Sequence, residues 1–181
     1  MSTPLRAGAI VNVLNRHGVR YIVIGAYAAI AQQAPIPATR DIDLTPDMSV
    51  DNLEHLSAAL KELGARIRTD AEVGGLPFDH GGRSLAASGN WNLTCPDGEF
   101  DISFHPSGFA DGYAALEPRA HLMQVETVEV LVADLADVIR SKEVAGRPKD
   151  LRVLPALYLF ERVRIGRQPG QHRDAGSDIS F

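Results

Sequence analysis

Residues 40–44 narrow the possible folds more than any other segment, because they alternate polar and apolar side chains. This alternation is the period of a half-buried β-strand. Successive side chains of a strand point to opposite faces, so Asp41 and Asp43 share one face. The opposite face carries Ile42 and Leu44. The chain is therefore expected to place one face of this strand against a core and its two carboxylates on the other.

Helices and strands are expected to alternate along the rest of the chain. Residues 21–24 form a short β-rich run that leads through Gly25 into an alanine-rich helix over residues 26–33. Residues 66–88, rich in glycine and polar side chains, are expected to be irregular with at most short elements. Further strands are predicted at residues 91–94, 100–104, 125 and 128–132. Further helices are predicted at residues 4–17, from a cap at 49 or 51 to about 63, and at 109–116, 134–145 and 149–164.

The order of these elements predicts an α/β (α+β) fold, in which a mixed sheet is flanked by helices and followed by C-terminal helices. A chain of 181 residues is long enough for one well-filled domain. We expect a single domain over residues 1–165, with a catalytic core at about 18–133 and a helical region at about 134–165. Residues 166–181 lack a repeating apolar face, so we expect a flexible tail there.

Composition and motifs argue against several classes of protein. The apolar runs are too short to cross a bilayer, and residues 1–20 show no secretory signal, so we expect a cytoplasmic protein without a membrane partner. The single cysteine, Cys95, excludes an internal disulfide framework and a cysteine-based zinc site. The absence of His-x-x-x-His, Gly-x-Ser-x-Gly and P-loop sequences argues against a zinc protease, an acyl-transfer triad and a P-loop enzyme.

Charge is distributed unevenly along the chain. Residues 1–139 hold nine Lys and Arg against eighteen Asp and Glu, whereas residues 140–173 hold nine against three. The last eight residues add two acids, which completes the net charge of −5. An acidic body beside a basic helical region suits a metal-binding half next to a phosphate-binding half. A solvated basic helix face without a function would give the same count.

The neighbours of the Asp-x-Asp pair give it a chemical meaning that it lacks alone, since this pair is common on surface strands. Two carboxylates on one face repel each other unless a cation lies between them, and Mg²⁺ accepts carboxylate oxygens together with substrate phosphates. Upstream, Gly25 allows the backbone to approach a phosphate. Downstream, Asp101 lies between two apolar residues on a later strand. With a third carboxylate, such a site can hold two metal ions about 3.5–4 Å apart. This arrangement aligns an attacking hydroxyl with a pyrophosphate leaving group.

On these residues the chain resembles the DNA polymerase β-type nucleotidyltransferase superfamily. The superfamily pattern is an apolar strand ending in Gly-Gly or Gly-Ser, then Asp-x-Asp, then a third Asp on a later strand. In this chain the three parts are Val23-Ile24-Gly25-Ala26, Asp41-Ile42-Asp43 and Phe100-Asp101-Ile102. Residues 39–44 and 137–151 are more similar to small bacterial nucleotidyltransferases that include the AbiEii-type toxins. The resemblance covers about residues 18–160, and Ala26 departs from it by offering no hydroxyl to a triphosphate.

The resemblance implies a role for each of these residues. Asp41, Asp43 and Asp101 would bind Mg²⁺ or Mn²⁺, and Asp101 could instead activate the acceptor hydroxyl. Lys142 would face the triphosphate from the surface of its helix. Asp150 would take part in catalysis or only stabilise the start of its helix. The residues expected to bind nucleotide are Gly25, Ala26, Thr39, Arg40 and Lys142.

The implied activity is transfer of a nucleotide from a nucleoside triphosphate to an acceptor, with release of pyrophosphate. The toxin-like resemblance favours an RNA acceptor, such as the 3′ end of a tRNA, and a cognate antitoxin as a further partner. A small molecule or a protein hydroxyl is the alternative acceptor. A second alternative is a protein that keeps this fold without catalysis and acts by binding a partner.

Overall fold

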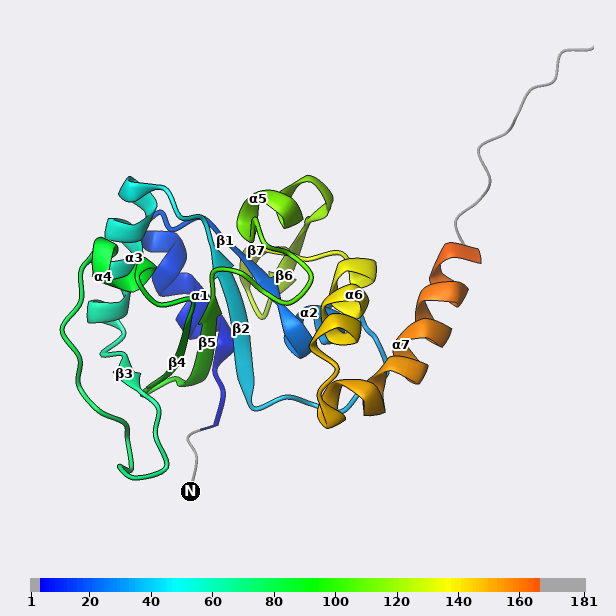
Figure 1. Ribbon diagram of the computed structural model, residues 1–181, viewed down its shortest axis with the longest axis horizontal. Coiled ribbons are helices and arrows are strands. Elements are labelled where there is room, and N and C mark those ends of the chain that lie inside the picture. The colour runs from blue at the N-terminus through cyan, green and yellow to red at the C-terminus, as the bar shows by residue number, and fades with distance from the viewer. Residues whose placement is uncertain (1–3, 167–181) are drawn as a thin grey trace, which may run out of the picture.

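The computed structural model describes residues 4–166, whose strands form one mixed seven-stranded sheet (Figure 1). The strand order is β3-β4-β5-β2-β1-β7-β6. The strands are β1 (Tyr21–Ile24), β2 (Asp41–Pro46), β3 (Arg66–Ile67), β4 (Asn90–Cys95), β5 (Gly98–Ser103), β6 (His121–Val125) and β7 (Val128–Val132). The helices are α1 (Ala7–Arg16), α2 (Gly25–Ala31), α3 (Val50–Glu62), α4 (Gly82–Ala86), α5 (Tyr113–Leu116), the 3-10 helix η1 (Glu117–Arg119), α6 (Leu135–Ala145) and α7 (Pro148–Gly166). The predicted α/β fold with a mixed sheet is confirmed.

The core lies against the apolar face of the central strands. β2 and β5 run parallel, and their register pairs Ile42 with Phe100 and Leu44 with Ile102. These four side chains are at most 1% exposed. α1 and α3, which pack against each other, contribute further buried leucines and isoleucines to the same core. The alternation in residues 40–44 therefore places the apolar side chains in the core and turns the aspartates to the opposite face.

The helix predicted at residues 134–145 is observed as α6, and the helix predicted at residues 149–164 is slightly longer, since α7 covers Pro148–Gly166. The Asp134 side chain caps α6 by accepting a hydrogen bond from the Ala136 N–H at 2.9 Å. α6 ends at Gly146, which adopts the left-handed φ of 58° that favours glycine. Pro148 then begins α7, at a position where a missing N–H leaves no helical hydrogen bond unmade. In Figure 1, α7 extends away from the sheet beyond α6.

Two predicted helices differ from the observed ones. α1 begins at Ala7 rather than at the start of residues 4–17. The reason is that the Arg6 N–H donates to the Asp97 carbonyl at 2.8 Å, which holds this segment against the turn between β4 and β5. The helix predicted over residues 109–116 is limited to the four residues of α5, because Gly112 before it adopts a φ of 51°.

The predicted tail also needs correction. Gly166 is the last residue of α7 and does not belong to a tail. The rest of the predicted tail, residues 167–181, lies outside the described part of the chain. Within residues 4–166, no helix combines the length and the apolar character needed to cross a membrane.

Candidate active site

Four carboxylates lie together on the face of the sheet opposite the core. Asp41 and Asp43 belong to β2, and Glu99 and Asp101 belong to β5. The parallel register pairs Asp41 with Glu99 and Asp43 with Asp101. Residues two apart on a strand share a face, so all four side chains point to the same side. Glu99 is absent from the sequence prediction, although its place two residues before Asp101 indicates the same face.

Gly25 lets the backbone come close to the Asp43 carboxylate. It joins β1 to α2 with a φ of +68°, which residues with a side chain rarely adopt. A Cβ atom on this residue would lie 2.1 Å from Asp43 Oδ2 and 2.8 Å from Asp43 Cγ. The approach is fixed by the sheet, because the register of β1 and β2 places Ile24 opposite Asp43. Glycine is therefore required here both by the carboxylate and by the backbone angle.

Burial and mutual repulsion oppose the ionisation of these acids. Burial, followed by the charges of Asp41 and Asp101, raises the pKa of Asp43 from 3.8 to about 7. Burial also raises the pKa of Asp101, although the charge of Arg68 opposes this shift. An additional positive charge close to Asp43 would therefore stabilise its ionised form.

Within residues 4–166, two other side chains hydrogen-bond to the four acids. Thr39 Oγ1 donates to Asp41 Oδ1 at 2.7 Å. Arg68 donates from Nη1 to Glu99 Oε2 at 2.9 Å, and from Nη2 to the two Asp101 oxygens at 2.8 Å and 3.1 Å. Sequence reasoning missed Arg68, because it lies in the irregular part of the chain and belongs to no periodic pattern.

The basic side of the site comes from the helices α6 and α7 and the turn between them. Asp150 is fully buried and accepts hydrogen bonds from Lys142 Nζ at 3.1 Å and from Arg147 Nε at 2.6 Å. Burial raises the pKa of Asp150, but these two hydrogen bonds outweigh it and hold the pKa below its usual value. Asp150 thus does more than stabilise a helix start, since it holds two cations in place.

The expectation that Lys142 lies on the surface of its helix is wrong. Its residue exposure is only 9%, because the ion pair with Asp150 draws the ammonium group between α6 and α7. Lys142 nevertheless lines the cavities described next. It is therefore both a buried partner of Asp150 and a charge at the site.

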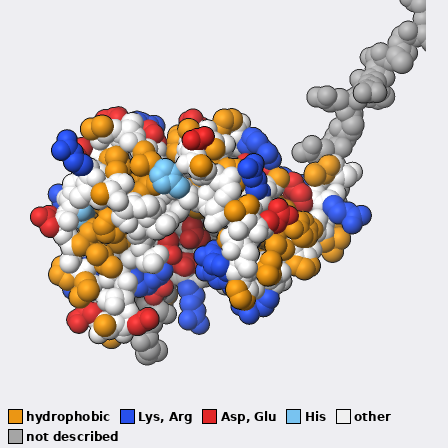
Figure 2. Space-filling view, viewed as in Figure 1, with side chains coloured by type: hydrophobic (Ala, Val, Ile, Leu, Met, Phe, Trp, Pro, Cys, Tyr) orange, Lys and Arg blue, Asp and Glu red, His pale blue; other side chains and the backbone are white. Residues whose placement is uncertain are grey.

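Two adjoining cavities meet at this arrangement of charges. The larger has a volume of about 470 Å³, and its amide, hydroxyl and imidazole side chains are Asn90, Asn92, Ser103, His105, Ser107 and Ser141. The smaller has a volume of about 270 Å³, and its own polar and basic side chains are Thr39, Lys149 and Arg152. Both cavities are lined by Gly25, Asp43, Lys142 and Arg147. Figure 2 shows acidic side chains at the bottom of a central hollow with basic side chains beside them.

The remaining predicted residues lie in different places. Ala26 lines the smaller cavity next to Gly25. Arg40 precedes β2, is exposed and lines neither cavity. The structure therefore brings every predicted site residue except Arg40 to the carboxylates, the basic turn or the two cavities.

The donor atoms of the site suit a hard divalent cation such as Mg²⁺ or Mn²⁺, which prefers carboxylate oxygens. As they are placed, no three Asp, Glu, His or Cys side chains among residues 4–166 form a group that could hold a metal ion. Asp41 and Asp43 fit best, because a cation there would relieve the repulsion that raises the pKa of Asp43. Asp101 fits less well as it stands, since both of its oxygens accept hydrogen bonds from Arg68, whose positive charge would repel a metal ion.

Replacing Asp43 with asparagine is expected to raise the free energy of unfolding when no divalent cation is present. The folded chain keeps the Asp43 proton up to about pH 7, whereas the ordinary pKa of 3.8 applies to the unfolded chain. Wild-type stability should therefore fall relative to Asp43→Asn by up to about 4 kcal/mol as the pH rises from about 4 to about 7, and the difference should then level off.

Urea unfolding of both proteins in a chelating buffer, between about pH 5 and about pH 8, measures this difference. A difference that stays constant or shrinks as the pH rises would contradict the raised pKa of Asp43.

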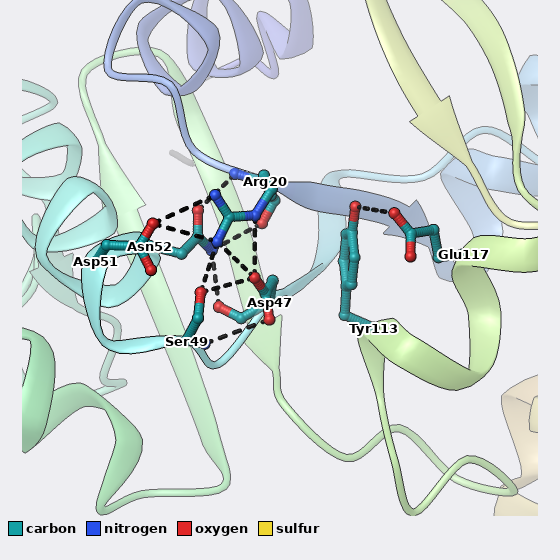
Figure 3. Close-up of polar contacts among 7 residues, drawn as sticks. All are labelled: Arg20, Asp47, Ser49, Asp51, Asn52, Tyr113 and Glu117. Carbon is teal, nitrogen blue, oxygen red and sulfur yellow. Dashed lines mark hydrogen bonds and ion pairs between the residues drawn. The ribbon is translucent and has the colours of Figure 1, made fainter.

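A second polar cluster lies at the other end of β1 and β2 (Figure 3). The Arg20 guanidinium pairs with Asp47 at 2.7 Å and donates to Ser49 Oγ at 2.6 Å. The buried Asn52 side chain accepts from the Arg20 N–H at 2.6 Å and donates to the Arg20 and Asp47 carbonyls. These bonds join the start of β1, the end of β2 and the start of α3, so the cluster explains part of the fold and not the chemistry.

Solved structures of two other proteins have a similar fold. The solution structure of the antibiotic-resistance factor ANT(2'')-Ia gives a TM-score of 0.54 at 14% sequence identity, over 88% of this chain and 86% of that chain. The crystal structure of a Thermotoga maritima protein assigned to the nucleotidyltransferases gives a TM-score of 0.51 at 13% identity, over 90% of this chain and 97% of that chain. No protein-family model and no curated protein sequence matches this chain. The chain therefore has the nucleotidyltransferase fold, with carboxylates and cations gathered around Gly25.

Proposed function

We propose that this chain is a metal-dependent nucleotidyltransferase that transfers a nucleotide from a nucleoside triphosphate to an acceptor hydroxyl. The observation that carries the proposal is the meeting of opposite charges at Gly25, where Asp43, Lys142 and Arg147 line the same two cavities. Nucleotide transfer needs carboxylates for a divalent cation and positive side chains for the phosphates. The nucleotidyltransferase fold supports the same activity.

Each charged group has a task in this proposal. Asp41 and Asp43 would hold Mg²⁺ or Mn²⁺, which when bound offsets the negative charge of the carboxylates and the phosphates. Lys142 and Arg147 supply fixed positive charge to the phosphate oxygens. Asp101 takes the proton of the acceptor hydroxyl as the acceptor oxygen bonds to the α-phosphorus and the bond to pyrophosphate breaks. The burial that raises the pKa of Asp101 makes it a stronger base for this step.

The difference between the two cavities favours one substrate for each. The smaller cavity adds Lys149 and Arg152 to the shared cations, which suits a triphosphate. The larger cavity offers amide and hydroxyl side chains with Asp101 in its wall, which suits the hydroxyl-bearing end of an acceptor. The nucleoside triphosphate would then lie on one side of Asp43 and the acceptor on the other.

For the acceptor we propose an RNA, such as the 3′ end of a tRNA. Basic residues outnumber acidic ones by nine to three over residues 140–173, which suits contact with an RNA backbone. The resemblance of residues 39–44 and 137–151 to AbiEii-type toxins supports the same acceptor. The chain would then act as the toxin of a toxin–antitoxin system, and a cognate antitoxin would restrain it.

A small molecule or a protein hydroxyl is the alternative acceptor. The fold similarity to the antibiotic-resistance factor ANT(2'')-Ia favours a small molecule, and a cavity of about 470 Å³ is large enough for one. The acidic side chains of the site would attract a cationic molecule. A non-catalytic, partner-binding protein is the remaining alternative, and the lack of a hydroxyl on Ala26 is the feature that favours it.

Incubation of the protein with Mg²⁺, each labelled nucleoside triphosphate and total tRNA tests the proposal. We expect label on RNA with the wild type and a loss of at least about 100-fold with Asp41→Ala, because the cation loses one of its carboxylates. Asp111→Ala removes an exposed aspartate outside the site and should leave transfer unchanged. Label on an added small molecule or protein would select the alternative acceptor. Absence of transfer to every acceptor would contradict the enzyme and favour the partner-binding protein.

A further inference from the structure

The sheet itself holds Arg68 against the four carboxylates. The Arg68 N–H donates to the Asn92 carbonyl at 2.8 Å, which continues the pairing of β3 with β4 by one residue. Asn92 is the register partner of Asp101. The guanidinium therefore reaches across β4 to the acids of β5, and backbone pairing fixes where its side chain begins.

The Arg68 guanidinium donates hydrogen bonds to two of the four acids, Glu99 and Asp101. One nitrogen, Nη1, donates to Glu99, and the other, Nη2, donates to both oxygens of Asp101. Among residues 4–166, no other Lys or Arg side chain forms an ion pair with any of the four carboxylates. Lys142 and Arg147 are paired with Asp150 instead.

A guanidinium and a divalent cation compete for the same carboxylate oxygens. Both Asp101 oxygens already accept a hydrogen bond from Arg68, and a cation beside them would also meet the positive charge of Arg68. Resting on the proposed function, we propose that Arg68 is an internal competitor that weakens the binding of divalent cations to the carboxylates of β2 and β5. Asp101 is then free to bind a cation or to accept a proton only when Arg68 withdraws.

The surroundings of Arg68 allow such a withdrawal. Residues 70–74, which follow it, are exposed, and Val73 is 97% exposed. The Arg68 side chain is itself 27% exposed, so it can turn towards solvent without opening the core. Since separate nitrogens serve the two acids, the guanidinium can also release Asp101 while it keeps its bond to Glu99. Asp41 and Asp43 form no hydrogen bond with Arg68, so a cation held by those two needs no movement of its side chain.

Mn²⁺ binding measured by calorimetry, without nucleotide, tests this inference. We expect Arg68→Gln to bind Mn²⁺ about tenfold more tightly than the wild type, because it frees Asp101 and removes one positive charge. Arg68→Lys keeps the charge without the two-nitrogen fork, so its affinity should lie between the two. Arg66→Gln, two residues earlier and within β3, is the matched control. Arg66 Nε donates to the Gly75 carbonyl at 2.9 Å, so this variant should bind Mn²⁺ as the wild type does.

The possible outcomes distinguish a failure of the proposed role of Arg68 from a failure of the proposed nucleotidyltransferase activity. Equal or weaker Mn²⁺ affinity in both Arg68 variants would overturn the competitor, while nucleotide transfer by the wild type would still support the enzyme. Tighter binding by the variants with no transfer by the wild type would support the competitor and contradict the enzyme. If Arg68→Gln does not fold, the affinity of Arg68→Lys decides by the same comparison. Absence of Mn²⁺ binding in every protein would overturn both proposals.

Discussion

Replacing Gly25 with alanine is expected to reduce nucleotide transfer by at least about 100-fold, because the new methyl group displaces the Asp43 carboxylate. The added Cβ would lie 2.1 Å from Asp43 Oδ2 and 2.8 Å from Asp43 Cγ, so the carboxylate has to rotate away from the site. A side chain at a φ of +68° adds strain of about 1–2 kcal/mol. Together with the displaced carboxylate, the loss of unfolding free energy should reach about 2–3 kcal/mol. Transfer assays and urea unfolding measure the two effects.

The variant Gly64→Ala distinguishes the effect of the close contact with Asp43 from the effect of backbone strain. Gly64 has a similar φ of +60°, but an added Cβ there would meet nothing within 4 Å. This variant should lose about 1–2 kcal/mol and keep its transfer activity. If Gly25→Ala also kept its activity, the position of the Asp43 carboxylate would not matter for transfer and the proposed site would be wrong.

The second large effect is expected from Asp150→Ala, which should lower the free energy of unfolding by about 3–5 kcal/mol. Asp150 is fully buried and is the hydrogen-bond partner of Lys142, whose side chain is only 11% exposed. Without the carboxylate, a largely buried ammonium group loses its only ion-pair partner among residues 4–166. Arg147 is 59% exposed and can turn to solvent, so it contributes less to the loss. Transfer should fall as well, because both cations lose the group that positions them.

The variant Lys142→Met then distinguishes the contribution of the Lys142–Asp150 pair to stability from its contribution to nucleotide transfer. Alone it leaves Asp150 with Arg147, and the loss of unfolding free energy should be about 1–3 kcal/mol. In the double variant with Asp150→Ala the loss should be smaller than the sum, because the buried charge disappears together with its partner. Transfer should stay low in the double variant, since the phosphates still lack the positive charge. Transfer that recovers together with stability would show that the pair is only structural.

Local patterns predict much of this fold. The strand at residues 40–44 and the helix at residues 134–145 are predicted from neighbouring residues alone, and the structure contains both, as β2 and α6. The order of strands depends on contacts between distant segments, which no local pattern contains. The start of α1 is an example, because the Arg6 N–H is fixed by the carbonyl of Asp97, far along the chain.

The residues of the candidate site can be predicted where they follow the polar–apolar alternation of a β-strand. Asp41, Asp43 and Asp101 follow the alternation of strands, and the register of the sheet brings them together. Arg68 could not be predicted in this way, because it lies just past the two-residue strand β3, in a segment without polar–apolar alternation. The burial of Lys142 also escapes a local reading, since it results from a carboxylate on the next helix.

The four carboxylates and the residues proposed to bind phosphate come from separate parts of the chain. The four carboxylates belong to β2 and β5, whereas Lys142 and Arg147 belong to α6 and to the turn between α6 and α7, where Asp150 holds them together. For protein engineering, residues 134–153 therefore form a segment that can be exchanged as a unit. Exchanging this segment would vary the charge and shape offered to a triphosphate, while the strands and their aspartates stay unchanged.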